Sequence, residues 1–344
     1  MSTEVQLHRD GRAGRIVLDR PRALNSLTHD MLTAVRTALD VWAADDAVRT
    51  VVLSGAGGRG LCAGADIRAI HDDAKAGGAG ARAFFRDEYG LNALIARYPK
   101  PYVAVMDGIT MGGGVGLSAH GGVRIVTERS TVAMPETRIG LVPDVGGSLL
   151  LARAPGGLGT HLGLTASSMD AGDALLCGFA DHFVPGERLA GFTAALAAVD
   201  PAEAVREFAA PPPTGALAGQ REWIDACYAG DTVEEIVDRL LSSGVPEAKE
   251  AAEQILAKSP TALKVTLAAL RRARLLDSLE AVLDQEYRIS CTALDSHDLV
   301  EGIRAQVVDK DRDPRWSPAA LAEVSEADVA RYFASRGTDE LGLA

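Results

Sequence analysis

Short apolar runs alternate with longer segments of helical periodicity along the first half of the chain. Residues 5–8 and 15–18 predict a β-hairpin, and three later apolar runs predict single strands. Strand, helix, strand repetition implies crossover connections, so we expect an α/β fold with a largely parallel sheet. The later strands are expected at residues 50–53, 101–106 and 123–126, and the helices at residues 28–43, 66–73, 79–97 and 113–120.

The pattern changes near residues 208–219, which are rich in alanine, proline and glycine and include three consecutive prolines. Beyond this segment the periodicity is almost entirely helical, so we predict a core domain at residues 1–209 and an all-helical region at residues 220–344. The second region is expected to cover the active site or to form an oligomer contact. Its clearest amphipathic helices are predicted at residues 233–241, 247–258, 262–272 and 279–292.

Composition and charge narrow the classes of function. The 344 residues are 47% hydrophobic but only 5% aromatic, and the formal net charge is −12, which argues against binding of nucleic acid. A ligand that carries phosphate must therefore be held by a local basic patch. No apolar stretch is long enough to span a bilayer, and residues 1–14 lack the apolar centre of a signal peptide, so we expect a cytoplasmic protein with no membrane partner.

The cysteines and histidines give no sign of a metal site. Four cysteines are widely spaced without a CxxC pair, which indicates free thiols, and the histidines do not follow metal-ligand spacing. We expect neither a metal nor a separate cofactor. The four cysteines are Cys62, Cys177, Cys227 and Cys291.

Two glycine-rich segments carry the first candidate chemistry. Residues 57–67 and 108–117 each follow an apolar strand and lead into a helix, so their backbone N–H groups are expected to approach one ligand atom. Such a pair of donors is how an oxyanion hole is built. Neither segment matches a phosphate-binding loop or a dinucleotide fingerprint. The alternative for residues 57–67 alone is a simple turn.

A third segment, residues 133–147, holds two carboxylates in apolar surroundings. Burial of Glu136 and Asp144 would raise their pKa values and fit them for acid–base or nucleophilic work. The structural alternative for Glu136 is a contact at a helix N-terminus. For Asp144 it is the N-cap of a helix at residues 145–151.

These three segments, in this order and spacing, resemble the crotonase superfamily of enoyl-CoA hydratases and isomerases, across residues 4–185. The resemblance implies a spiral core of repeated strand, strand, helix turns, with an oxyanion hole formed by the N–H groups of Ala65 and Gly113. It also implies residues that contact CoA, although for Arg22 the alternative is a solvated surface charge. The implied CoA contacts are Arg22, Leu24, Ala63, Ala65, Asp66 and Ile67, with Arg68 and Lys310 as further phosphate partners.

The resemblance is stronger to one group in the superfamily, whose members hydrolyse 3-hydroxyisobutyryl-CoA. It rests on residues 85–89, on the tail at residues 286–311, and on Gly116, where a hydratase would carry a glutamate. It implies hydrolysis of a short 3-hydroxyacyl-CoA thioester, as in valine catabolism, with Glu136 attacking directly or activating water. Asp144 is then the partner that orients substrate or shares the proton. The implied substrate-binding residues are Glu88, Gly113, Glu136 and Asp144.

Two other functions stay open at this point. The first is an enoyl-CoA hydratase or isomerase of fatty-acid oxidation that uses Glu136 with Asp144. The second is a scaffold that binds acyl-CoA without catalysis, because Gly116 lacks a carboxylate. The resemblance includes trimers and hexamers, so a homo-oligomer is a further expectation.

Overall fold

The computed structural model describes residues 3–344 and divides into two compact units. Unit 1 contains residues 1–65, 90–133 and 169–216, and unit 2 contains residues 66–89, 134–168 and 217–344. The units are described separately. The sequence boundary predicted between residues 209 and 220 stays a prediction.

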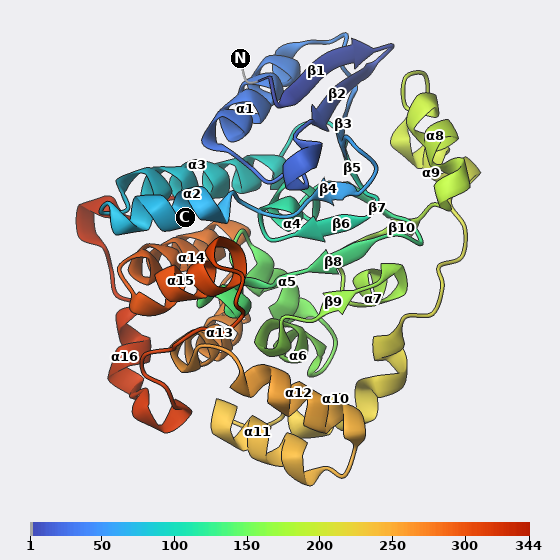
Figure 1. The fold of residues 1–344 in the computed structure, drawn as a ribbon. Helices are drawn as coiled ribbons and strands as arrows, with labels where there is room; N and C mark the ends of the chain where they lie inside the picture. The colour runs from blue at the N-terminus through green and yellow to red at the C-terminus, as the bar shows by residue number, and fades with distance from the viewer. Residues whose placement is uncertain (1–2) are drawn as a thin grey trace. The chain divides into compact units, whose positions relative to one another are not determined.

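Unit 1 is built on two sheets (Figure 1). The larger has the strand order β1-β2-β3-β5-β7-β10 and the smaller has the order β4-β6-β8-β9. The predicted hairpin is confirmed as the antiparallel pair β1 and β2, and β2, β3, β5, β7 and β10 then pair in parallel. The strands of the larger sheet are β1 (Val5–Asp10), β2 (Ala13–Leu18), β3 (Thr50–Gly55), β5 (Tyr102–Met106), β7 (Val123–Val126) and β10 (His182–Phe183).

Successive strands alternate between the two sheets, which gives the spiral that the resemblance implied. The chain passes from β3 to β4, from β5 to β6 and from β7 to β8, and each time changes sheet. The sequence pattern missed the strands of the smaller sheet because a strand of two or three residues is too short to show alternation. These strands are β4 (Gly60–Cys62), β6 (Ile109–Met111), β8 (Thr131–Ala133) and β9 (Ser168–Met169).

Helices return the chain between these strands in unit 1. α1 (His29–Ala44) begins at Thr28, whose side chain accepts a hydrogen bond from Met31 N, and it buries an apolar face. The apolar strand residues join α8 (Gly186–Ala195) and α9 (Pro201–Phe208) in one buried cluster. Parallel strands that are covered on both faces read as continuous apolar runs, which is why they could be predicted. The remaining short helices are α4 (Gly113–Ser118) and α7 (Ala171–Leu176).

Unit 2 is helical and confirms the four predicted amphipathic helices to within about two residues. Three of the four starts are well defined because Thr232, Ser259 and Ser278 each accept a hydrogen bond from a backbone N–H of the first turn. The four are α11 (Val233–Ser242), α12 (Pro246–Leu256), α13 (Pro260–Ala273) and α14 (Leu279–Leu294). The others that matter below are α2 (Ile67–Lys75), the first part of α3 (Ala79–Ala96), η2 (Glu136–Ile139), α5 (Gly147–Arg153), α6 (Leu158–Thr165) and α15 (His297–Ile303).

The end of α15 leads into a π-helical turn, η4 (Arg304–Val308), and then into an extended tail. Arg304 organises this tail through ion pairs with Glu301, Asp309 and Asp311, at N–O distances of 2.8, 2.8 and 2.6 Å. No helix within residues 3–344 has both the length and the apolarity needed to cross a membrane.

Candidate active site

The predicted oxyanion donors lie in unit 1, where the start of α4 packs closely on the segment that follows β4. A Cβ atom on Gly114 would lie 2.5 Å from Cys62 O, and one on Gly64 would lie 3.8 Å from Gly113 N. At Gly114 the approach requires glycine because a Cβ would clash with Cys62, and at Gly64 glycine is favoured by the φ of 103°. The turn before α4 is also set by glycine, since Gly112 has φ 50°. The structure brings the two glycine-rich segments together, as predicted.

The N–H groups of Ala65 and Gly113 have no hydrogen-bond acceptor within residues 3–344. Gly113 is the first residue of α4, so its N–H has no partner inside the helix. Two unpaired N–H groups on adjacent segments, one at a helix start, are suited to bind a developing oxyanion. The assignment of these two groups as the oxyanion hole stays a prediction.

The turn predicted to contact CoA packs on the same segment of unit 1. Leu24 and Asn25 have left-handed backbones with φ 54° and 56°. The buried Asn25 side chain fixes this turn, because its Nδ2 donates to Ala56 O and to Gly60 O, both at 3.1 Å. Ala63 N donates to Leu24 O at 3.0 Å. Leu24 and Ala63 therefore lie together, next to the exposed Arg22.

The other predicted CoA contacts, Asp66 and Ile67, belong to unit 2. Asp66 caps α2 by accepting a hydrogen bond from Ala69 N at 3.4 Å, and Ile67 is the first residue of that helix. Arg68 donates to Val307 O at 2.8 Å, so part of its guanidinium is already engaged by the π-helical turn. Lys310 is exposed on the tail.

Four buried carboxylates gather in unit 2, and we call Glu88, Glu136, Asp144 and Glu286 the acidic cluster. Glu88 comes from α3, Glu136 from η2, Asp144 from the loop before α5, and Glu286 from α14. Their exposed fractions are 1%, 6%, 5% and 0% in the same order. The sequence predicted the first three. It gave Glu286 no role, although a glutamate on the buried face of an amphipathic helix is a recognisable signal.

Asp144 is held by Tyr89 rather than by a helix start. The Tyr89 hydroxyl donates to Asp144 Oδ2 at 2.6 Å and lies 2.8 Å from Ser290 Oγ. The alternative in which Asp144 caps a helix at residues 145–151 is wrong, because α5 starts two residues later with Gly146 as its N-cap and has no side-chain cap. Asp144 therefore does not cap α5.

Glu286 holds the loop that follows Asp144. Its carboxylate accepts hydrogen bonds from Gly146 N at 2.6 Å, Ser148 N at 3.1 Å and Ser148 Oγ at 2.5 Å. Immediately before Gly146, the buried Val145 has φ 52°, which is a strained conformation for a β-branched residue. Such strain persists only where surrounding contacts impose it, and the Glu286 contacts do so immediately beside Asp144.

Burial and mutual repulsion raise the pKa values of the acidic cluster. Loss of solvent raises the pKa of Asp144 to about 6 and that of Glu286 to about 8. Burial, followed by the charge of Asp144, raises the pKa values of Glu88 and Glu136 well above their usual range. Asp144 and Glu286 therefore exchange protons closer to neutral pH than ordinary carboxyl groups do.

Two fully buried oxygens of the acidic cluster, Glu88 Oε1 and Glu136 Oε2, have no hydrogen-bond partner within the described residues. An unpaired buried carboxylate oxygen is costly and indicates a role toward a ligand or water. Glu136 is the first residue of η2, whose N-cap is Pro135 and which has no side-chain cap. The helix N-terminal contact that was the structural alternative for Glu136 is therefore absent from the described hydrogen bonds. Among residues 3–344 no group of three or more potential ligands is arranged to hold a metal ion.

The chain winds through two sheets as a spiral of strands and helices, and it has an unpaired backbone donor at the start of α4. This fold is that of the crotonase superfamily. The chain belongs to the enoyl-CoA hydratase/isomerase family, whose model matches residues 13–333.

Similar proteins carry names for more than one reaction. The rat mitochondrial 3-hydroxyisobutyryl-CoA hydrolase is 41% identical over 99% of this chain and 91% of its own length, and the human one is 41% identical over 98% and 90%. A solved structure called a carnitinyl-CoA dehydratase from Mycobacterium thermoresistibile is 54% identical, with a TM-score of 0.96 over 99% of both chains. One called an enoyl-CoA hydratase from Rhodobacter sphaeroides is 43% identical, with a TM-score of 0.94 over 98% of this chain and 99% of its own.

Proposed function

We propose that this protein hydrolyses the thioester of a short 3-hydroxyacyl-CoA, most closely 3-hydroxyisobutyryl-CoA, to 3-hydroxyisobutyrate and CoA. The observation that carries the proposal is Glu136, a buried carboxylate with a raised pKa and an unpaired Oε2. The near full-length similarity to 3-hydroxyisobutyryl-CoA hydrolases of vertebrates supports the same reaction. A place in valine catabolism follows from this substrate.

The sequence of α4 supports hydrolysis over hydration. A hydratase of this superfamily would carry a glutamate at position 116, but α4 here has Gly116 and no acidic residue at all. Addition of water across a double bond uses two groups to deliver the hydroxyl and the proton. Thioester cleavage instead needs one carboxylate near the carbonyl carbon and donors for the oxyanion.

In the proposed mechanism the N–H groups of Ala65 and Gly113 bind the thioester oxygen. Glu136 removes a proton from water, the water oxygen attacks the carbonyl carbon, and the C–S bond breaks to release the thiolate of CoA. The proton on Glu136 then returns to that sulfur. Each backbone donor contributes about 3 to 4 kcal/mol in comparable sites. Asp144 orients the 3-hydroxyl or shares the proton, and Glu88 lines the acyl position.

Direct attack by Glu136 Oε2 is the second route, and it passes through a mixed anhydride. A single turnover in H₂¹⁸O separates the two. General-base catalysis places ¹⁸O in the released acid in every turnover. In the anhydride route, water attack on the Glu136 carbonyl leaves ¹⁸O on the enzyme and unlabelled acid, which mass spectrometry of Glu136-containing peptides detects.

The experiment that tests the function is product identification. The purified protein is incubated with 3-hydroxyisobutyryl-CoA in H₂¹⁸O under multiple turnover, and the acid is analysed by mass spectrometry. We expect free CoA and 3-hydroxyisobutyrate with one ¹⁸O per hydrolysed bond. Intact thioester after prolonged incubation would contradict the proposal.

Hydration or dehydration is the second candidate, because two solved structures with 43% and 54% identity bear such names. In that reaction Asp144, with its pKa of about 6, would serve as the second acid beside Glu136. Loss of enoyl absorbance from crotonyl-CoA or crotonobetainyl-CoA, without thiol release, would establish it. If neither assay shows turnover but CoA binds, the third candidate, a non-catalytic scaffold, is supported.

We also propose a cytoplasmic location and a homo-oligomer, a trimer or a hexamer. Four buried free cysteines suit a reducing compartment. The names of the vertebrate relatives include the word mitochondrial, so fractionation of the producing cells is the deciding experiment for location. Light scattering gives the mass of the assembly.

A further inference from the structure

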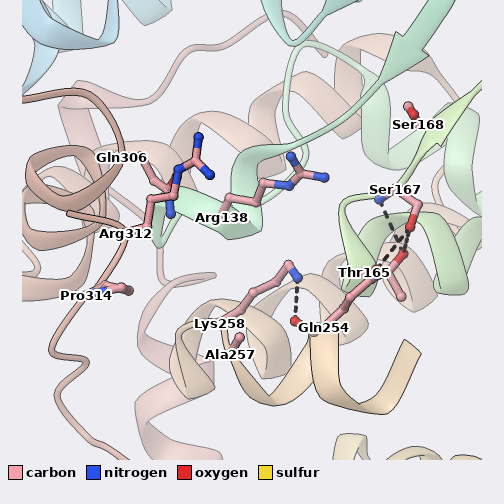
Figure 2. Close-up of a pocket in the computed structure, with 10 residues that line it drawn as sticks. All are labelled: Arg138, Thr165, Ser167, Ser168, Gln254, Ala257, Lys258, Gln306, Arg312 and Pro314. Carbon is pink, nitrogen blue, oxygen red and sulfur yellow. Dashed lines mark hydrogen bonds between the residues drawn. The ribbon is translucent and has the colours of Figure 1, made fainter. Parts of the chain in front are cut away.

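A cavity of about 570 Å³ lies in unit 2 and shares no residue with the acidic cluster (Figure 2). We call it the basic pocket. Its walls come from η2, from the end of α6 and the turn after it, from the end of α12, and from η4 with the extended tail. The lining residues are Arg138, Thr165, Ser167, Ser168, Gln254, Ala257, Lys258, Gln306, Arg312 and Pro314.

Three cations and no carboxylate line the basic pocket. Arg138, Lys258 and Arg312 come from three separate segments, as Figure 2 shows. On the neighbouring tail Asp309 and Asp311 pair with Arg304, whereas the exposed Asp313 makes no ion pair with a described residue. In a chain of net charge −12, a pocket with only positive charges is a local exception that favours an anion.

Lys258 lies in an electrostatically unfavourable position, because it is buried and close to another cation. It is only 7% exposed, and its ammonium donates to a backbone oxygen, Gln254 O. Burial, and then the charge of Arg138, lowers the pKa of Lys258 to about 8. Two cations this close, one of them buried, destabilise each other unless an anion binds with them. A bound anion would offset both the burial and the repulsion.

The remaining donors are available to the same ligand. The guanidinium of Arg312 makes no hydrogen bond with any described residue. Arg138 uses one terminal nitrogen to donate to Ala166 O at 2.7 Å, which leaves its other N–H groups unused by that bond. Thr165 Oγ1 donates to His161 O at 2.6 Å and Ser167 Oγ donates to Thr165 Oγ1 at 2.8 Å, so both hydroxyl protons are already used. The amides of Gln254 and Gln306 add neutral donors. Guanidinium, ammonium and amide donors match the oxygens of a phosphate group.

The volume of the pocket sets the size of the ligand. Small-molecule sites are about 300–1,000 Å³, so 570 Å³ exceeds what one phosphate group fills and suits a phosphate on a small organic body. We propose that the basic pocket binds a small phosphomonoester through Arg138, Lys258 and Arg312. The phosphate belongs either to the CoA moiety or to a separate phosphorylated molecule.

The experiment is isothermal titration calorimetry of the full-length protein, without acyl-CoA, at fixed ionic strength. Inorganic phosphate and ribose 5-phosphate are the probes, and ribose is the uncharged control. Arg312→Gln and Lys258→Gln test the pocket. Arg153→Gln is the matched control, because Arg153 is an exposed arginine of the same unit without a hydrogen bond to a described residue. Circular dichroism confirms that each variant is folded.

We expect saturable binding of both phosphate probes, none of ribose, at least tenfold weaker binding in R312Q and K258Q, and no change in R153Q. Binding should also weaken as ionic strength rises. Absence of saturable binding, or equal affinity in the wild type and both pocket variants, would overturn the proposal.

A competition titration identifies the source of the phosphate. Displacement of ribose 5-phosphate by CoA would assign the pocket to the CoA moiety, and its absence would assign a separate phosphorylated molecule; both support a phosphomonoester site. These readouts need no turnover, so they stand apart from the test of thioester hydrolysis.

Discussion

The candidate oxyanion hole of unit 1 and the acidic cluster of unit 2 are built in opposite ways. The first consists of backbone N–H groups of Ala65 and Gly113, and its geometry depends on side chains being absent at Gly64 and Gly114. The second consists of side chains only, and four carboxylates from α3, η2, a loop and α14 are buried together. The donors are therefore fixed by local chain shape, whereas the acids are fixed by tertiary contacts.

This difference determines which substitutions are expected to impair the oxyanion hole and which are expected to impair the acidic cluster. Backbone donors survive most side-chain changes and fail when a Cβ enters at the close contact of Gly114 or when proline replaces the donor residue. The acids are sensitive to isosteric changes, because each one depends on its charge, its partner and its burial. The predictions below test this contrast.

The largest effect is expected from Glu136→Gln. The amide keeps the shape of the side chain but cannot accept the proton of water, so turnover in thiol release should fall about 10³-fold. The dissociation constant for CoA, measured by calorimetry, should stay within about threefold. Turnover close to that of the wild type would remove Glu136 from the mechanism.

The next effect is expected from Gly113→Pro. Proline is tolerated at the first position of a helix, but its ring removes the N–H and places Cδ where the hydrogen lay, so turnover should fall about 10²- to 10³-fold. Gly113→Ala is the matched control, because it adds a Cβ and keeps the donor. Equal losses in the two variants would show that crowding, not the missing N–H, is responsible.

A smaller effect is expected from Tyr89→Phe. The Tyr89 hydroxyl holds down the pKa of Asp144, so its removal should raise that pKa further above about 6 and move the acid limb of kcat/KM to higher pH. Phenylalanine retains the stacking of this ring on Phe85, whose centroid is 5.9 Å away. A pH profile identical to that of the wild type would mean that Asp144 does not titrate in the reaction.

Glu286→Gln should change the pH dependence of stability. Because burial raises the pKa of Glu286 to about 8 from an ordinary 4.5, the folded state retains a proton that the unfolded chain has lost between these values. The contribution of this proton to the free energy of unfolding is fully present below pH 4.5 and is lost as the pH rises through 8. The free energy of unfolding should therefore fall less steeply from pH 5.5 to 8.5 in E286Q than in the wild type. Parallel urea-unfolding curves would contradict the assignment.

The smallest effect is expected from Asp66→Ala, which removes the cap of α2 and should lower the free energy of unfolding by about 1 kcal/mol. If Asp66 also contacts CoA, KM for the acyl-CoA should rise at constant kcat. An unchanged KM would limit Asp66 to capping.

The sequence predicted five of the six strands of the larger sheet and the long helices, but it missed β10, a strand of only two residues. The glycine-rich segments at residues 57–67 and 108–117 were found because each follows a strand and precedes a helix, which is a local pattern, whereas Ala65 and Gly113 were singled out by the family resemblance. Glu136 and Asp144 were found as carboxylates in apolar surroundings, and both proved to be buried.

The supporting contacts could not be predicted from local patterns. Glu286 reaches Gly146 from 140 residues away, and Tyr89 reaches Ser290 from 201 residues away. The alternative that Asp144 caps a helix at residues 145–151 is wrong, because Val145 takes a left-handed backbone, which no local preference of valine favours, and α5 starts at Gly147. Such features arise only when distant helices pack together.

The most direct test of the account compares two rates in one enzyme preparation. Thiol release from 3-hydroxyisobutyryl-CoA and hydration of crotonyl-CoA are measured as kcat/KM under the same conditions. We predict that thiol release exceeds hydration by at least about 100-fold, a factor that corresponds to about 2.7 kcal/mol of transition-state discrimination. Faster hydration than thiol release would contradict the account and show that Asp144 replaces the glutamate missing at Gly116.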